Sequence, residues 1–277
     1  MNLVLEILGR RADGYHEIAT VMQTVELADR VILEEASGLQ LRAPTGVPHD
    51  GTNLALRAAV ALQEAARGDA GVRITLDKRI PVAAGLGGGS ADAAGVLLGL
   101  NRLWRLRWPV DRLAEVAVTL GMDVPFFLRG GCALATGRGE KLERIWGPSL
   151  ALVLVNPRFA SSTAEAYAQV TPALYGDGQR SRAVIEALRS RRAARVAASL
   201  YNGLEDVVGA RHPEVGRMHA ALLAAGALGA VMSGSGPTVL GIARSFEQAR
   251  QLRARLARGS WECWAVRTTR GPAVRFQ

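Results

Sequence analysis

Residues 81–92 read Pro81-Val82-Ala83-Ala84-Gly85-Leu86-Gly87-Gly88-Gly89-Ser90-Ala91-Asp92, and an apolar segment of helical period follows as far as Leu103. Glycine allows positive φ angles and lets a ligand approach the main chain without meeting a Cβ atom. A helix that begins at such a loop presents unpaired N–H groups and the positive end of its dipole, which together bind phosphate. A flexible linker or tight turn is the simpler alternative. The basic pair Lys78-Arg79 before the loop and the helical pattern after it favour a phosphate loop.

The glycine pattern separates this loop from two other phosphate-binding loops. It lacks the Gly-Lys-Ser/Thr ending of a P-loop, and no acidic residue follows at the distance expected for a dinucleotide-binding βαβ unit. It resembles the phosphate loop of the GHMP kinases, whose pattern P-x-x-x-G-L-G-[GS]-[GS]-[SA]-A is matched at every position. The resemblance implies that ATP is bound by Pro81, Val82, Ala83, Ala84, Gly85, Leu86, Gly87, Gly88, Gly89, Ser90 and Ala91.

The resemblance covers essentially the whole chain and implies the fold. It implies an α+β protein with the two-domain GHMP kinase fold. Residues 1–148 would form an ATP-binding domain like ribosomal-protein S5 domain 2, and residues 149–277 a ferredoxin-like substrate domain. The segment Trp146-Gly-Pro-Ser149 marks the expected boundary between them.

Hydrophobic periodicity gives the expected elements in both halves. Residues 151–155 are continuously apolar, which is typical of a strand buried on both faces. The expected strands are 2–8, part of 20–34, 71–77, 132–136, 151–156, 239–243 and 263–268. The expected helices are 52–67, 91–103, 109–120, 162–170, 180–200, 213–225 and 246–258.

Composition limits the classes of partner. Of the 277 residues 49% are hydrophobic, which is ample for a core, but no apolar run reaches the roughly 18 residues of a membrane span. We expect a cytoplasmic protein, because no signal peptide is evident and the two cysteines form neither a disulfide framework nor a metal cluster. The net charge of +9 comes almost entirely from arginines that scatter along helices without interleaved aromatic residues. We therefore expect no nucleic-acid or membrane partner, and a monomer or weak homodimer.

Asp123 is the candidate catalytic residue. It lies between Gly121-Met122 and the apolar run Val124-Pro-Phe-Phe127, at a turn in water-poor surroundings. A turn or cap aspartate is the alternative for this motif alone. A kinase needs a carboxylate near the acceptor hydroxyl, to orient it or take its proton. In the GHMP kinases the matching G-x-D-V-P aspartate has this role.

A second glycine-serine loop reads Ser233-Gly-Ser-Gly-Pro-Thr238. Alone it is a weak signal for a turn. It matches the third GHMP kinase motif, which implies that it lies beside the phosphate loop and that Gly234 and Ser235 contact the substrate.

The segment Asp13-Gly-Tyr15-His16 narrows the choice within the family. A β-turn with a surface tyrosine is the alternative. The element resembles that of the GHMP kinases acting on a cytidine diphosphate-linked methylerythritol in non-mevalonate isoprenoid biosynthesis. That resemblance implies that Tyr15 stacks on the cytosine ring and that His16 hydrogen-bonds the edge of the base. It also implies that Tyr167 faces Tyr15 and that Asn2 binds the erythritol part. Such an enzyme phosphorylates the 2-hydroxyl of its substrate with ATP.

The sequence departs from this family at its start. The family's catalytic lysine precedes the asparagine by two residues, so its position falls before Met1. We expect low turnover from the sequence as given, and about a hundredfold gain or more when upstream residues with that lysine are restored. This departure leaves an ATP-binding pseudoenzyme as an alternative. Another GHMP kinase with a homoserine- or mevalonate-type acceptor is also possible, although the Asp13–His16 element argues against it.

Metal ligands are the least defined part of the site. Phosphoryl transfer from ATP normally needs Mg²⁺ across the phosphates, so Mg²⁺ is expected with ATP. Ser90 and Asp92 are candidate ligands, but no residue is assigned to the metal.

Overall fold

A computed structural model describes residues 1–257 and 259–271. These residues form two compact units, each made of separate stretches of the chain. The larger unit contains Met1–Glu26, Ala83–Leu86 and Gly131–Gly271, and the smaller unit contains Leu27–Val82 and Gly87–Gly130. This division follows compactness alone, and the expected domain boundary at residues 148 and 149 stays a prediction.

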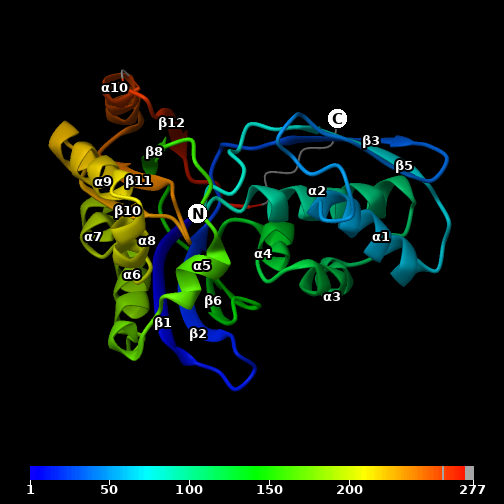
Figure 1. The fold of residues 1–277 in the computed structure, drawn as a ribbon, viewed down its shortest axis with the longest axis horizontal. Helices are drawn as coiled ribbons and strands as arrows, with labels where there is room; N and C mark the ends of the chain where they lie inside the picture. The colour runs from blue at the N-terminus through cyan, green and yellow to red at the C-terminus, as the bar shows by residue number, and fades with distance from the viewer. Residues whose placement is uncertain (258, 272–277) are drawn as a thin grey trace. The chain divides into compact units, whose positions relative to one another are not determined.

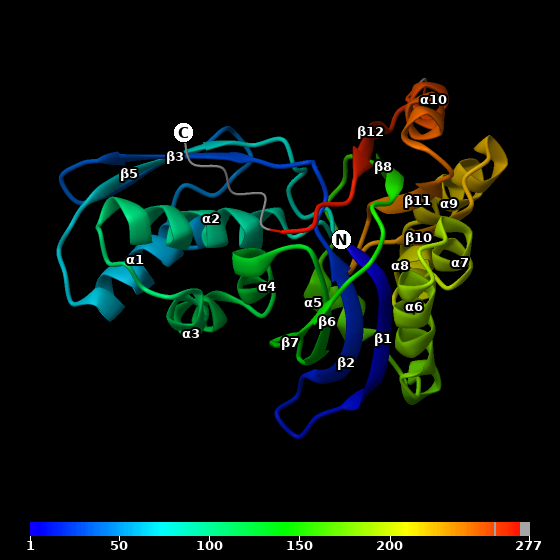
Figure 2. The same cartoon turned by 180° about the vertical axis from the view of Figure 1, so that it is seen from behind.

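The smaller unit is a three-stranded sheet with helices on one face (Figure 1 and Figure 2). Its strands have the order β3-β5-β4, with β3 antiparallel and β4 parallel to the central β5. Local signals begin its first helix, because the Asn53 side chain accepts a hydrogen bond from the Ala55 N–H. The elements are β3 (Arg30–Glu35), β4 (Leu39–Arg42), α1 (Leu54–Ala66), β5 (Val72–Asp77), α2 (Gly88–Leu103), α3 (Val110–Leu120) and α4 (Val124–Arg129).

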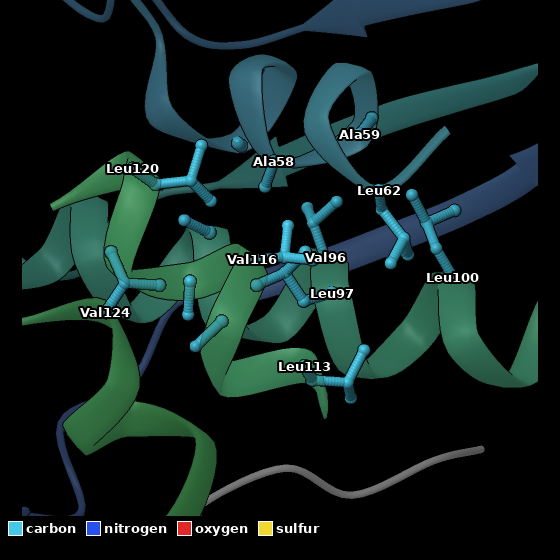
Figure 3. Close-up of a cluster of buried hydrophobic side chains, with 14 of the residues drawn as sticks. Ala58, Ala59, Leu62, Val96, Leu97, Leu100, Leu113, Val116, Leu120 and Val124 are labelled. Carbon is cyan, nitrogen blue, oxygen red and sulfur yellow. The ribbon is translucent and has the colours of Figure 1, made fainter. Parts of the chain in front are cut away.

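The core of the smaller unit lies between α1, α2 and α3 (Figure 3). Small residues such as Ala58 and Ala59 on α1 let the helices approach, and Leu97 and Leu100 on α2 fill the space between them. All four side chains are fully buried. This packing holds α2, whose first turn follows the glycine loop, in a fixed place within the unit.

The larger unit contains two sheets and the helices that pack on them. The first sheet has the order β7-β6-β2-β1-β9, in which β1 is antiparallel to β2 and parallel to β9. Helix α6 packs against β1 and β2. The strands of this sheet are β1 (Asn2–Arg10), β2 (His16–Gln23), β6 (Cys132–Gly137), β7 (Lys141–Ile145) and β9 (Tyr201–Asn202).

The second sheet of the larger unit is antiparallel and has the order β10-β11-β8-β12. Numbered along the chain from β8, this order is 2-3-1-4, which is the ferredoxin-like arrangement. Central strand β8 (Ala151–Asn156) is buried from Leu152 to Asn156, as its continuous apolar sequence predicts. The other strands are β10 (Gly229–Met232), β11 (Val239–Ala243) and β12 (Glu262–Arg267).

The helices of the larger unit agree with the sequence except around residue 190 and at Glu205–Arg211, where the sequence predicted no helix. The helix expected over 180–200 is two helices, because Arg191 has a φ of 56°, which interrupts the helical backbone. The expected end of the last helix at Arg258 lies outside the described residues. The helices are α5 (Thr163–Ala168), α6 (Gln179–Arg189), α7 (Ala193–Ala198), α8 (Glu205–Arg211), α9 (Glu214–Ala225) and α10 (Phe246–Leu256), with a 3₁₀ turn at Pro172–Leu174.

Among the helices of the described ranges, none is long and apolar enough to cross a membrane.

Candidate active site

The glycine loop leads directly into α2. Gly87 is the N-cap residue, has a φ of 70°, and provides no side-chain hydrogen bond to the first helical turn. The N–H groups of that turn therefore have no acceptor from the cap residue, as an anion site at a helix N-terminus requires. Gly89 is exposed and Ser90 half-exposed at this turn. The sequence predicts that this helix begins near Ala91, whereas in the structure α2 begins at Gly88.

Phe127 connects the glycine loop with the segment that carries Asp123. A Cβ atom on Gly87 would lie 2.7 Å from the Phe127 ring, so only glycine lets the ring pack there. Asp123 is the N-cap residue of α4, two residues after Gly121, the C-cap residue of α3. Its surface remains accessible, yet the surrounding protein desolvates the carboxyl and raises its pKa above the ordinary value. The position between two helices agrees with the expected turn, but Asp123 is exposed there, which differs from the water-poor surroundings expected of it.

Lys78 lies between two carboxylates beside the start of α2. Its Nζ donates to Asp92 Oδ2 at 2.6 Å and to Asp29 Oδ2, and all three side chains are at least nine-tenths buried. The Nζ atom lies 3.4 Å from the position of a Cβ atom on Gly88. Burial raises the pKa of Asp92 to about 7, against the lowering effect of Lys78. Asp92 is therefore engaged with Lys78 and faces a core, not an open metal site.

The second glycine-serine loop packs against residues 84 and 85 of the larger unit. The Ser233 hydroxyl donates to the Gly85 carbonyl at 2.8 Å, and the Thr238 N–H donates to the Ala84 carbonyl at 3.3 Å. A Cβ atom on Gly85 would lie 2.2 Å from the Ser233 carbonyl oxygen, so glycine is required for this approach. The two loops, which are about 150 residues apart in sequence, are thus neighbours.

Asn2 lies at the same place. Its N–H donates to the Ser233 hydroxyl at 3.1 Å, and its side-chain amide donates to Thr20 Oγ1 at 2.8 Å. Its Oδ1 lies 3.2 Å from the position of a Cβ atom on Gly234. The Ser235 hydroxyl contacts Thr163 Oγ1 at 2.7 Å. The structure therefore brings together Asn2, Gly234, Ser235 and the Ala83–Leu86 part of the phosphate loop.

Two residues that support the second loop had no role assigned from sequence. The Asn202 side chain donates to the carbonyls of Met232 and Gly234 at 2.7 and 2.8 Å. Glu205 accepts from the Met232 N–H at 3.0 Å. Both belong to Tyr201-Asn-Gly-Leu-Glu205, and the polar residues placed beside Tyr201 and Leu204 are the sequence signal that could have identified them.

The aromatic candidates fall into two contacts. The rings of His16 and Tyr167 lie 5.3 Å apart between centroids and are tilted by 30°. The Tyr15 ring, 56% exposed, is instead covered by the guanidinium of Arg138 at 5.0 Å from the ring centroid. Burial and the charge of Arg10 lower the pKa of His16, which favours the neutral imidazole. Sequence reasoning did not identify Arg138.

In residues 1–257 and 259–271, no group of three or more His, Cys, Asp or Glu could hold a metal ion. Mg²⁺ nevertheless fits a site of this kind, because it keeps several waters and is bound largely by substrate phosphates.

Comparison with known proteins decides the family. The family model "GHMP kinases N terminal domain" matches residues 53–131, and "GHMP kinases C terminal" matches residues 184–262. A 4-diphosphocytidyl-2-C-methyl-D-erythritol kinase from Pelotomaculum thermopropionicum is 47% identical over 97% of this chain and 95% of its own length. The enzyme of the same name from Synechococcus sp. (strain JA-3-3Ab) is 48% identical over 91% and 85%. The chain belongs to the 4-diphosphocytidyl-2-C-methyl-D-erythritol kinase group of the GHMP kinase family.

Solved structures support the same group and its fold. The crystal structure of a 4-(cytidine 5'-diphospho)-2C-methyl-D-erythritol kinase matches with a TM-score of 0.83 and 39% identity, over 96% of each chain. A homoserine kinase from Cytophaga hutchinsonii matches with a TM-score of 0.71 over 93% of this chain and 89% of its own. Its identity of 18% shows the fold alone. The expected α+β GHMP kinase fold is confirmed.

Proposed function

We propose that this protein transfers the γ-phosphoryl group of ATP to the 2-hydroxyl of 4-diphosphocytidyl-2-C-methyl-D-erythritol, a step in non-mevalonate isoprenoid precursor biosynthesis. The observation that carries the proposal is the 47% identity to an enzyme of that name over nearly the whole of both chains. Homoserine- and mevalonate-type acceptors have weaker support, because the matches to those kinases are 18% and 17% identical.

The phosphates of ATP bind to the loop Pro81–Ala91. The support is the uncapped first turn of α2 and the positive φ angles of Gly85 and Gly87. Main-chain N–H groups aimed at a phosphate need no reorganisation when negative charge develops on it. Gly88, Gly89 and Ser90 in the first turn supply these groups. Mg²⁺ accompanies the nucleotide, neutralises charge on the phosphates when bound, and takes its ligands mainly from phosphate and water.

The cytidine diphosphate end of the substrate binds to the larger unit. Tyr15 and Tyr167 stack on the cytosine ring, and His16, whose pKa is lowered, hydrogen-bonds the edge of the base as a neutral imidazole. Asn2, Gly234 and Ser235 contact the erythritol part. The support for this group is that Asn2 and Gly234 lie together and that the rings of His16 and Tyr167 are in contact.

Asp123 takes the proton of the acceptor hydroxyl. Desolvation raises the pKa of its carboxyl, which makes it a stronger base than an ordinary aspartate once it is ionised. The aspartate is held at the N-cap of α4, a short helix fixed by the packing of Phe127 on Gly87.

The cellular setting and assembly are proposed on weaker grounds. We place the protein in the cytoplasm, where the free cysteines Cys132 and Cys263 remain reduced. It acts on small molecules as a monomer or weak homodimer.

Release of ADP tests the proposed reaction directly. Purified protein with ATP and Mg²⁺ should release ADP when the cytidine diphosphate-linked methylerythritol is added, and not with homoserine or mevalonate. Turnover with one of the latter acceptors would show a different kinase. Binding of ATP without turnover of any acceptor would show a pseudoenzyme.

Replacement of Asp123 tests the catalytic assignment. Asp123→Asn should lower kcat by about 100- to 10,000-fold and leave a folded protein, because general-base catalysis contributes that much. The kcat of the native protein should also rise with pH through the raised pKa of Asp123, so its acid limb should lie above the range of ordinary aspartates. Asp69→Asn, at an exposed aspartate of the same unit, is the control and should retain full activity. Equal turnover by Asp123→Asn and the control would remove Asp123 from the mechanism.

A further inference from the structure

The turn between β6 and β7 is shaped to present Arg138. Gly137 and Gly139 on either side of it have φ angles of 74° and 114°, which favour glycine. The Glu140 carboxylate accepts a hydrogen bond from the Arg138 N–H at 2.7 Å. A Cβ atom on Gly137 would lie 2.7 Å from that carboxylate. Thus the sequence Gly137-Arg-Gly-Glu140 fixes the backbone from which the arginine projects.

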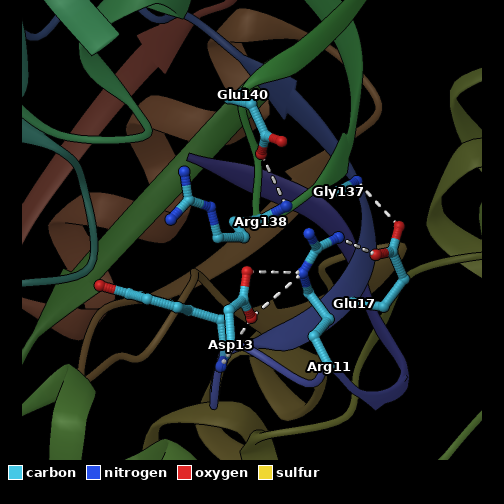
Figure 4. Close-up of polar contacts among 7 residues, drawn as sticks. Arg11, Asp13, Glu17, Gly137, Arg138 and Glu140 are labelled. Atoms are coloured by element: carbon cyan, nitrogen blue, oxygen red, sulfur yellow. Dashed lines mark hydrogen bonds and ion pairs between the residues drawn. The ribbon is translucent and has the colours of Figure 1, made fainter. Parts of the chain in front are cut away.

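A chain of polar contacts joins this turn to the turn that carries Tyr15 (Figure 4). The Gly137 N–H donates to Glu17 at 3.1 Å, and Glu17 pairs with Arg11 at 2.6 Å. Arg11 pairs with Asp13 at 3.2 Å, and Asp13 accepts from the Tyr15 N–H at 3.2 Å. The network fixes the main chain at both ends, so the positions from which Arg138 and Tyr15 extend are set together.

Their side chains meet in a cation–π contact. The Arg138 guanidinium carbon lies 5.0 Å from the Tyr15 ring centroid, within the range in which such contacts are attractive. Arg138 is half-buried, and no carboxylate of the described ranges lies within 4.0 Å of its guanidinium. Asp13 pairs with Arg11, and Glu140 accepts from the Arg138 main chain. The charges of Asp13 and Glu140 act on Arg138 from farther away, and the Tyr15 ring is the group that its guanidinium covers.

We propose that Arg138 is a positioning residue for the cytidine end of the substrate, which rests on the function proposed above. Its guanidinium covers one face of the Tyr15 ring and restricts the rotation of an otherwise exposed side chain. The other face is then held ready for the cytosine ring. Because a residue ordered before binding loses less entropy on binding, Arg138 increases affinity for the cytidine substrate without touching it.

The first experiment compares Michaelis constants. Arg138→Ala should raise KM for the cytidine substrate about two- to fivefold, which is the fold-change that corresponds to an exposed cation–π contact. KM for ATP and kcat should not change. Arg138→Gln should behave as Arg138→Ala, and Arg138→Lys should restore part of the affinity. Arg144→Ala is the matched control, because Arg144 of β7 covers the ring of Trp146, the residue after that strand, at 4.3 Å, and it should leave all constants unchanged.

A double-mutant cycle distinguishes positioning from direct contact. In a Tyr15→Leu background, Arg138→Ala should have no further effect on KM, because its partner is absent. An equal effect in both backgrounds would mean that Arg138 binds the substrate itself and would overturn the inference. So would a native KM in folded Arg138→Ala and Arg138→Gln. Failure of the native protein to phosphorylate the cytidine substrate would instead overturn the proposed function.

Discussion

At the scale of the residue, the Lys78 cluster places one positive charge between two carboxylates. Asp29 also accepts hydrogen bonds from the N–H groups of Arg79 and Ile80, at 2.6 and 2.8 Å. Asp92 accepts from Lys78, lies against the Asp29 carboxylate and is buried in α2. Since a single ammonium cannot fully compensate two buried carboxylates, the proton goes to the one with fewer donors. This explains why burial raises the pKa of Asp92 to about 7.

The raised pKa predicts how stability depends on pH. Between the ordinary aspartate pKa and pH 7, Asp92 ionises in the unfolded chain but stays protonated in the folded one, so stability falls as pH rises. The loss amounts to at most about 4 kcal/mol. The Asp92→Asn variant should lack this loss of stability, while its side-chain oxygen still accepts a hydrogen bond from Lys78. Urea unfolding at pH 4, 5.5 and 7 measures this, with Asp69→Asn as control. Parallel curves for Asp92→Asn and the native protein would contradict the assignment of the proton.

At the scale of the element, helix α6 depends on a carboxylate from another element. Its own N-cap residue, Gly178, supplies no side chain. Glu6 of β1, only 1% exposed, accepts from the N–H of Gly178 at 2.9 Å and from the N–H and hydroxyl of Ser181 at 3.0 and 2.9 Å. An acidic group at this position also complements the positive end of the helix dipole. The start of α6 is therefore fixed to the first sheet.

Replacement of Glu6 tests this cap. Glu6→Gln puts an amide NH₂ group against N–H donors, so the free energy of unfolding should fall by about 1–3 kcal/mol. Glu143→Gln, at an exposed glutamate on β7 of the same sheet, should change it by less than about 0.5 kcal/mol. Equilibrium urea unfolding compares the two variants. Equal midpoints would show that α6 does not need the buried carboxylate.

Elements that carry a capping signal in their own sequence were predictable. Elements fixed by contacts with residues distant in sequence were not. Asn53 and Ser245 cap α1 and α10 with their own side chains, and both helices begin where the sequence predicts. The break between α6 and α7 has no such signal, because Arg191 lies within a run of alanine and arginine. The same holds for the site. Its loops are local glycine motifs, whereas Asn202 supports the second loop, and Arg138 covers Tyr15, through contacts between residues distant in sequence.

At the scale of the whole molecule, the division into units runs through the phosphate loop. The chain passes from the larger to the smaller unit between Leu86 and Gly87, inside the segment proposed to bind ATP. The residues proposed for the cytidine substrate belong to the larger unit, and Asp123 belongs to the smaller. A ligand that binds only the folded chain stabilises it by about 2.7 kcal/mol at one hundred times its Kd. The rise in stability produced by each ligand therefore measures the binding of that ligand separately.

Tyr167→Ala should separate the two ligands in this measurement. Stacking of a base on an aromatic ring contributes about 1–3 kcal/mol, so the variant should lose about that much of the stabilisation produced by the cytidine substrate. The rise in Tm produced by ATP should stay as in the native protein, because Tyr167 lies outside the phosphate loop. Tyr167→Phe keeps the ring and should keep both shifts. The measurement is thermal unfolding with each ligand at a fixed multiple of its native Kd. If Tyr167→Ala reduced both shifts equally, it would be acting through the fold, and Tyr167 would have no place against the base.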